Sequence, residues 1–274
     1  MKRTESWFRR GRPPAAGSVG PKFVASLARG LSLLSCFSVQ RPYLGVAELS
    51  RDVNLPLSTV KRMVRTLALL GYLQHEERLG KYSLGPAALA LSALAPGPAQ
   101  LRDFAAPFMQ ELAEETGVSV ALGSRQQLSM VCIEVSNASG LVTLNMEVGM
   151  ELPLAESAIG RAYLAVCPES ERRILLETTR APDGVPSTSL QRAIDRSIAS
   201  YAALGACSSF GEWRPDVNGV AVGLRPAGSP TMSITCGAPA ARASPQYMLD
   251  EVRPRLLEFV RRIELGMYGR ASEK

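Results

Sequence analysis

Residues 46–82, which read VAELSRDVNLPLSTVKRMVRTLALLGYLQHEERLGKY, constrain the fold of this chain more than any other segment. Apolar residues at i, i+3 and i+7 from Val46 predict a helix of about two turns. Asn54 can adopt the left-handed conformation that ends such a helix, and Pro56 fits the first position of a following one. Two helices joined by a tight turn predict a helix-turn-helix.

The second of these helices is predicted to have an apolar side and a cationic side. The apolar residues recur at the spacing of a buried stripe, at Val60, Met63, Val64, Leu67 and Leu70. The opposite side carries hydroxyl and cationic groups, at Ser58, Thr59, Lys61, Arg62 and Arg65. Hydroxyls suit phosphate oxygens and base edges, Arg can bridge guanine O6 and N7, and Lys supplies a mobile charge. This chemistry is typical of a recognition helix on double-stranded DNA.

The residues after Gly71 predict a β-hairpin. Residues 72–74 and 81–84 alternate as short strands around a polar loop at 75–80. Arg78 and Lys81 are expected to reach the sugar-phosphate backbone from the region of its tip. A helix-turn-helix followed by a hairpin predicts a winged helix-turn-helix over residues 22–85.

The positive charge of the chain lies in its first third. The chain has 274 residues and a formal net charge of +6. Residues 1–90 hold 14 Lys and Arg against 5 Asp and Glu, whereas residues 91–274 hold 17 against 20. A basic module joined to a slightly acidic one suits a protein that holds a polyanion with its N-terminal part. Membrane-surface binding is the competing interpretation, and the basic amphipathic helix it needs is missing.

The N-terminal segment, residues 1–21, is predicted to be a disordered basic arm. It contains five Lys and Arg, and no apolar run follows them as a secretory signal would need. After the arm, Leu27, Ala28, Leu31 and Leu34 predict a first helix with one apolar stripe. No run of about 20 apolar residues free of breakers occurs, so a soluble, cytoplasmic protein is expected.

The residues that serve catalysis and metal binding are scarce. Five scattered cysteines without a C-x-x-C spacing make a disulfide framework or a zinc site improbable, and free thiols in a reducing cytoplasm are expected. The single histidine, His75, falls in the predicted hairpin, which argues against a His-dependent triad. No metal or cofactor is expected. An enzyme remains a weak alternative, and a regulator of the same fold that senses oxidation or a protein partner is another.

The C-terminal part is predicted to be α+β. Pro96, Gly97 and Pro98 mark a boundary, and an amphipathic helix then runs from Leu101 to near Gly117. The expected strands are 118–122, 128–135, 141–146, 217–224 and 231–236. The expected helices are 158–166, 169–178, 190–204 and 245–265. Strand runs separated by helices favour an antiparallel sheet.

Residues 152–160, LPLAESAIG, are the most informative part of this second region. Ser157 is a good N-cap, which leaves the amides of Ala158, Ile159 and Gly160 as donors for a carboxylate. Gly160 destabilises a helix by about 1 kcal/mol relative to Ala, which suggests the close approach of a ligand or of another backbone. The alternative is a plain helix start with the glycine packed on the sheet.

Residues 23–266 resemble the IclR family of bacterial transcriptional regulators. The resemblance lies in VAELSRDVNLPLSTVKRMVRTLALLGYL, GKYSLGPAALAL, LRDFAAPFMQELAEETGVSVALG and LPLAESAIGRAYLAV, in this order. It implies a winged helix-turn-helix, a linker helix in residues 86–100 and, over residues 101–270, an effector-binding and oligomerisation domain with a curved antiparallel sheet flanked by helices. It also implies homodimers or homotetramers on a palindromic operator, controlled by a small organic acid, with repression or activation left open.

The resemblance also places the effector site, because the family segment that matches residues 152–160 lines the ligand cavity. The expected contacts are Met146, Leu154, Ser157, Ala158, Ile159, Gly160, Glu212, Val220, Val222, Ile234 and Cys236. The chain departs from the family pattern at several positions. Ala155 replaces a common His, Arg161 replaces a common Lys, and Ser209 and Phe210 stand at usually acidic positions, whereas Glu212 is retained. These apolar walls predict that the effector is more apolar than a short hydroxy acid. An aromatic acid is one such effector.

Overall fold

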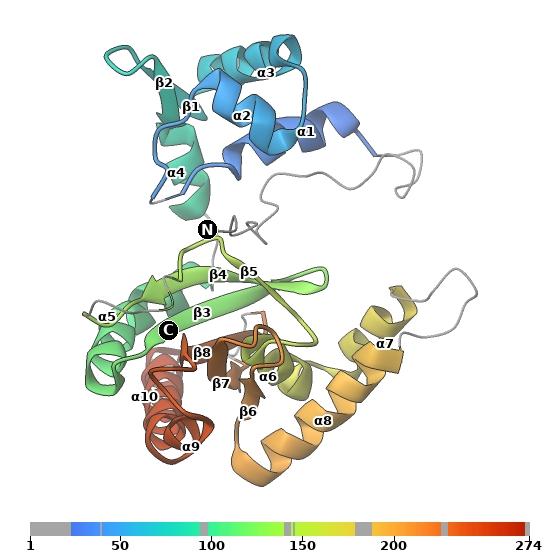
Figure 1. The fold of residues 1–274 in the computed structure, drawn as a ribbon, viewed down its shortest axis with the longest axis vertical. Helices are drawn as coiled ribbons and strands as arrows, with labels where there is room; N and C mark the ends of the chain where they lie inside the picture. The colour runs from blue at the N-terminus through green and yellow to red at the C-terminus, as the bar shows by residue number, and fades with distance from the viewer. Residues whose placement is uncertain are drawn as a thin grey trace. The chain divides into compact units, whose positions relative to one another are not determined.

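A computed structural model describes residues 23–38, 40–93, 98–139, 144, 146–178, 188–225 and 230–271 (Figure 1). The chain divides into two compact units, Met1–Ala95 and Pro96–Lys274. The predicted basic arm, residues 1–21, lies outside the described residues. In the described part of the chain, no helix combines the length and the apolar character needed to cross a membrane.

The first unit is a winged helix-turn-helix (Figure 1). Its elements are α1 (Ala25–Leu34), α2 (Val46–Val53), α3 (Leu57–Leu69), the strands β1 (Leu73–Glu76) and β2 (Lys81–Leu84), and α4 (Pro86–Ala93). Leu33, Leu49, Val60, Val64 and Leu73 bring α1, α2, α3 and β1 into one apolar core. The predicted domain type is confirmed.

The turn between α2 and α3 forms as the sequence predicts, with one small shift. Asn54 ends α2 in the left-handed conformation, at φ 53° and ψ 49°. The Ser50 hydroxyl donates to the carbonyl oxygen of Leu55 at 2.6 Å and closes the turn. Pro56 is the N-cap of α3 rather than its first helical residue, so α3 begins at Leu57.

Two predictions for the first unit are wrong in detail. Leu27 and Leu31 do not belong to a buried stripe, since they are 61% and 54% exposed, and α1 packs through Leu33 instead. The reason is that only the C-terminal part of α1 contributes buried residues to the core. The hairpin is also shifted, because β1 extends from Leu73 to Glu76 and pairs His75 with Tyr82. The loop is therefore residues 77–80.

The second unit is built on a six-stranded antiparallel sheet with the strand order β5-β4-β3-β8-β7-β6. The strands are β3 (Ser119–Gln126), β4 (Ser129–Ser136), β5 (Glu151–Pro153), β6 (Cys207–Phe210), β7 (Val217–Leu224) and β8 (Met232–Pro239). The predicted α+β class with an antiparallel sheet is confirmed. Most of the predicted strand at 141–146 lies outside the described residues, and its described members, Leu144 and Met146, are in no strand.

Helices cover both faces of this sheet (Figure 1). They are α5 (Pro98–Thr116), α6 (Ala158–Val166), α7 (Glu169–Thr178), α8 (Thr188–Leu204), α9 (Pro245–Tyr247) and α10 (Arg253–Ala271). A π-helical turn, Met248–Val252, joins α9 to α10, so the predicted helix over 245–265 is interrupted. The main apolar core lies between one face of the sheet and α5 and α10, and α6 packs on the other face.

Candidate functional site

Helix α3 presents a row of exposed cations. Lys61, Arg62 and Arg65 are exposed, whereas Val60 and Val64, on the opposite side of the helix, are buried. Among the residues that the structure describes, none of these three cations has a carboxylate partner. Their charges are therefore available to an external polyanion, as the sequence predicts.

The remaining predicted residues of α3 differ in their exposure. Ser58 is exposed and Thr59 is half-buried in the first turn of the helix. Leu70, predicted to end the buried stripe, is 61% exposed because α3 ends at Leu69. The hydroxyl pair thus lies at the N-terminal end of the cationic row.

The two basic residues of the hairpin have different surroundings. Arg78 is exposed in the loop between β1 and β2. Lys81 is the first residue of β2, and its Nζ lies 3.2 Å from Oε2 of Glu48. The Glu48 carboxylate also accepts a hydrogen bond from the amide of Gly45 at 2.7 Å, and this bond, more than Lys81, lowers the pKa of Glu48. Lys81 is thus tied to the start of α2, whereas Arg78 is not.

The start of α6 is capped by a serine, as predicted. The Ser157 hydroxyl accepts a hydrogen bond from the amide of Gly160 at 3.2 Å and donates to the carbonyl oxygen of Pro153 at 2.5 Å. The amide of Gly160 is therefore not an open donor, which corrects the prediction for this residue. Helix geometry gives the amides of Ala158 and Ile159 no intrahelical acceptor. Those two amides remain suited to a carboxylate.

Gly160 is explained by the backbone that crosses it. A Cβ added at this position would lie 2.6 Å from the Cα of Leu154 and closer still to its carbonyl oxygen. Real Cβ atoms do not approach a backbone so closely, so only glycine fits. The close approach foreseen from the sequence is thus made by the chain itself, and the glycine is no sign of a ligand.

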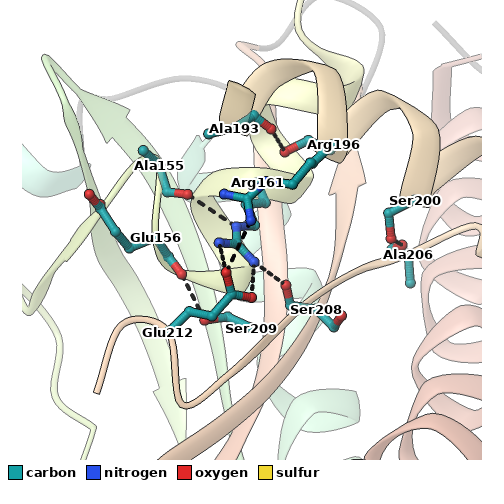
Figure 2. Close-up of polar contacts among 11 residues, drawn as sticks. Ala155, Glu156, Arg161, Ala193, Arg196, Ser200, Ala206, Ser208, Ser209 and Glu212 are labelled. Carbon is teal, nitrogen blue, oxygen red and sulfur yellow. Dashed lines mark hydrogen bonds and ion pairs between the residues drawn. The ribbon is translucent and has the colours of Figure 1, made fainter. Parts of the chain in front are cut away.

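A buried arginine joins α6 to the strand β6 and the residues after it (Figure 2). The Arg161 guanidinium donates to Oε1 and Oε2 of Glu212 at 2.6 and 2.7 Å. It also donates to the carbonyl oxygens of Ala155, at 3.1 Å, and Ser208, at 2.9 Å. The hydrogen bonds from Arg161 are the main cause of the lowered pKa of Glu212. Glu212, predicted to contact an effector, is therefore engaged by the protein's own arginine.

The predicted apolar walls are on the wrong face of the sheet. Val220, Val222, Ile234 and Cys236 are buried in the core with residues of α5 and α10. Strand residues alternate between faces, so the neighbours at 219, 221, 223, 233 and 235 are the ones that face α6. A Cβ added to Gly219 would lie 3.5 Å from the Cβ of Ala158. The four assignments to the effector site are thus overturned.

Most of the residues on the sheet face that packs against α6 were not predicted from the sequence. A Cβ added to Gly123 would lie 2.6 Å from Cδ1 of Ile159, and one added to Gly237 would lie 3.8 Å from Sδ of Met146. Met146, Ala158 and Ile159 therefore cover one face of the central strands. Ser233 lies on the same face, and its buried hydroxyl has no partner among the described residues. The alternation of Gly, Ala, Ser and Thr with large apolar residues in β7 and β8 was the signal for this face.

Family models match both units of the chain. The model described as "Bacterial transcriptional regulator IclR C-terminal" matches residues 97–265, and the "IclR helix-turn-helix domain" matches residues 26–77. The first match alone spans more than half of the chain. The chain belongs to the IclR family of bacterial transcriptional regulators.

Individual IclR relatives agree with this assignment. The regulator TsaQ1/TsaQ2 of Comamonas testosteroni is 34% identical over 251 residues, which are 90% of each chain. The crystal structure of an IclR family regulator from Brucella abortus superposes with a TM-score of 0.65 at 35% identity, over 94% of this chain and 98% of that one. An IclR homologue from Microbacterium hydrocarbonoxydans, solved with 4-hydroxybenzoate, has the same fold, with a TM-score of 0.69 at 23% identity over 89% and 100%.

Membership of the IclR family decides between the classes considered from the sequence. The relatives are transcriptional regulators and not enzymes, so this chain is a transcriptional regulator with a DNA-binding helix-turn-helix. The redox alternative gains nothing from the cysteines, all of which are buried. Burial raises the pKa of the Cys167 thiol to about 11 and that of Cys207 to about 12, so neither forms a reactive thiolate near neutral pH.

Proposed function

We propose that this IclR regulator binds a palindromic operator in double-stranded DNA as a homodimer or homotetramer, under the control of a small organic acid. The acid binds where α6 begins. The observation that carries the DNA half is the row of exposed cations on α3. The acid half rests on the amides of Ala158 and Ile159, which have no intrahelical acceptor, and on the sheet face that α6 shares with Met146 and Ser233.

The recognition helix carries groups of two kinds for DNA. Arg62 and Arg65 have the forked donors that read guanine in the major groove, and Lys61 supplies a charge for the phosphates. Ser58 and Thr59 lie at the N-terminal end of the helix, where hydroxyls and amides meet phosphate oxygens. Arg78 on the hairpin adds a contact with the sugar-phosphate backbone of the DNA. Lys81 contributes less to DNA binding because it is paired with Glu48.

Exposed apolar residues on the first unit support self-association. Leu27 and Leu31 share one side of α1, Val24 is the N-cap residue just before this helix, and all three are exposed. Leu89 and Leu91 are exposed on α4, a helix without a charged residue. Such surfaces on a small domain favour a second copy of the same chain. A twofold dimer places two recognition helices in successive major grooves, which requires a palindromic site.

The two proposed sites assign a function to each domain of the chain. Residues 22–85 form the DNA-binding domain, residues 86–100 carry the linker helix, and residues 101–270 bind the effector and contribute to oligomerisation. The linker couples the two functions. An acid changes operator affinity only if it binds one arrangement of the paired DNA-binding domains better than the other.

The class of effector is an acid with one carboxylate and a small body. The amides of Ala158 and Ile159 hold the carboxylate at the positive end of the α6 dipole. The strand residues that face α6 are Gly, Ala, Ser and Thr, so the neighbourhood is more polar than the apolar walls that the sequence suggested. Benzoate, 4-hydroxybenzoate and a short hydroxy acid such as lactate are therefore tested side by side.

Two measurements on the purified full chain test this function. Selection from random duplex DNA, followed by titration at several salt concentrations, should recover a palindromic site whose affinity falls steeply with salt. A thermal-shift screen of the three acids should then find at least one that raises the melting temperature and changes operator affinity. Failure to select any sequence would reject the operator, and the absence of any stabilising acid would reject the effector class.

A further inference from the structure

All the polar contacts of the Arg161 side chain lie around the first turn of α6. The side chain is 8% exposed, yet it carries a full charge. Its hydrogen-bond acceptors are the Glu212 carboxylate and the carbonyl oxygens of Ala155 and Ser208 (Figure 2). A buried charge is expensive unless it is paired and hydrogen-bonded, and here both conditions are met.

These contacts join the segment before α6 to the strand β6. Ala155 stands two residues before the N-cap Ser157, and Ser208 is in β6. A separate bond makes the same connection, because the Ser209 hydroxyl donates to the carbonyl oxygen of Glu156 at 2.7 Å (Figure 2). Residues 155 and 156 are thus held to β6 through their carbonyl groups. The cap and the two free amides follow directly in the chain.

The Glu212 carboxylate also pairs with an arginine of helix α8. Arg196 Nη1 lies 3.4 Å from Oε2 of Glu212, and the Arg196 side chain is mostly exposed. Glu212 therefore bonds a buried arginine of α6 and an exposed arginine of α8. Because Arg161 occupies both carboxylate oxygens at short range, it is the dominant partner.

We propose that Arg161 is a positioning residue of the effector site: through Glu212, Ala155 and Ser208 it fixes the direction of the free amides at the start of α6. This inference rests on the proposed function, in which those amides hold the carboxylate of the acid. Arg161 itself is assigned no contact with the acid, since four of its five N–H donors are bonded to Ala155, Ser208 and Glu212. Its contribution is to keep the two amides convergent before the acid arrives.

The fork of the guanidinium is essential to this role. Arg161 uses Nε toward Ala155, Nη1 toward Ser208 and Glu212, and Nη2 toward the second oxygen of Glu212. An ammonium group is a point charge and cannot span these separate acceptors. Arg161→Lys therefore keeps the charge and removes the connections, which separates positioning from simple charge compensation.

A second ion pair, which bonds Tyr163 of the same helix, serves as the matched control. Arg125 at the end of β3 lies 2.8 Å from Glu171 of α7, and both bond the hydroxyl of Tyr163 in α6. This pair is also partly buried and also joins α6 to its neighbours. It lies beyond the first turn, away from the amides of Ala158 and Ile159. Its loss should lower stability without changing the site.

The experiment compares Arg161→Lys and Glu212→Gln with Arg125→Lys and Glu171→Gln in the full chain. Titration calorimetry with benzoate and with 4-hydroxybenzoate gives the affinity, and thermal unfolding gives the loss of stability. Amide hydrogen exchange over residues 155–160, which exclude Tyr163, gives the local order of the site without any ligand. We expect Arg161→Lys to weaken acid binding about tenfold and to speed amide exchange in this segment. Arg125→Lys should lower the melting temperature by a similar amount without either effect.

Each result decides the proposal. The proposal is supported if the Arg161 and Glu212 variants, and not the Arg125 and Glu171 variants, show faster exchange at residues 155–160 and weaker acid binding. Equal effects in both pairs, or wild-type exchange and affinity in Arg161→Lys, overturn it. If neither acid binds the wild-type chain, the effector class of the proposed function fails. Amide hydrogen exchange then tests the positioning role by itself. That role is rejected if the segment is as well protected from exchange in Arg161→Lys as in Arg125→Lys.

Discussion

The backbone of Leu154 passes against Gly160 so closely that a Cβ at position 160 would lie 2.6 Å from the Leu154 Cα. This crossing places the segment before the helix directly on its first turn. It accounts for a glycine at a helical position where alanine is intrinsically favoured. The start of α6 is thus shaped by packing of the chain on itself, and the proposed acid site lies beside that crossing.

Gly160→Ala is expected to destabilise the protein. Alanine gains about 1 kcal/mol of helix propensity, but overpacking against the Leu154 backbone costs typically 1–3 kcal/mol, occasionally more. The free energy of unfolding in urea should therefore fall. Gly30→Ala in α1 is the control, since a Cβ there meets nothing within 4 Å and should stabilise slightly. Equal stabilisation of both variants would show that the crossing does not constrain position 160.

Arg62→Ala and Arg65→Ala are expected to weaken operator binding. A residue that bridges a guanine should lose about 1–3 kcal/mol of binding free energy and relax specificity at one base pair. Fluorescence anisotropy with the selected operator and single-base variants measures both effects. Arg261→Ala in α10 removes an exposed arginine of the other unit and should leave the affinity unchanged. If both α3 variants kept the wild-type affinity, the assignment of the DNA-reading face to Arg62 and Arg65 would be wrong.

The two hairpin cations are expected to differ in their salt effects. Arg78→Ala should reduce the slope of log affinity against log salt by about one unit if Arg78 meets a phosphate. Lys81→Ala should reduce it by less, because Lys81 is already paired with Glu48. Titrations of both variants between low and moderate salt give the two slopes. A larger effect of Lys81 than of Arg78 would mean that the pair with Glu48 opens on DNA.

The Glu212 carboxylate is expected to make stability depend on pH in the acidic range. Hydrogen bonds from Arg161 lower its pKa below the ordinary value of 4.5 in the folded protein. The ionised group therefore stabilises the fold above that value, and this contribution disappears as the pH falls through the folded-state pKa. The stability difference between wild type and Glu212→Gln should shrink below pH 4.5. Glu258→Gln, at an exposed carboxylate, controls for general charge effects, and a constant difference would contradict the account.

The cysteines are expected to react slowly in the folded protein. All five are buried, and burial raises the pKa of Cys207 to about 12. Labelling with a thiol reagent at pH 8 should proceed only as fast as the structure opens, and mild oxidant should leave operator binding unchanged. Labelling is followed by mass spectrometry. Rapid modification of one cysteine together with altered operator binding would favour the redox alternative.

Local rules predict the DNA-binding domain well because its signals are local. Asn54 and Pro56 mark the turn within three residues, and the cationic face of α3 is set by helical spacing alone. The orientation of α1 depends instead on tertiary packing. Leu27 and Leu31 have the spacing of a buried stripe, yet Leu33 is the residue that enters the core. An exposed apolar row cannot be distinguished from a core row by its period.

The residues around the proposed effector site are harder to predict because the sheet is covered on both faces. All eight residues of β7 are buried, so hydrophobicity does not tell which set of alternating residues faces α6. Only residue size does so, through Gly219 and Gly223. The bond between Arg161 and Glu212 joins residues 51 positions apart, and no local pattern encodes it. The cap at Ser157, by contrast, was predictable from its residue type and was correctly placed.

The most direct test of the central claim is the affinity of the full chain for its selected operator, with and without an acid that stabilises the protein. The account predicts sequence-specific, salt-dependent binding that the acid changes severalfold, and loss of that response in a variant with a disordered α6 start, such as Arg161→Lys. Operator binding that no acid alters would contradict the proposed control. Binding to DNA without sequence preference would contradict the proposed function as a whole.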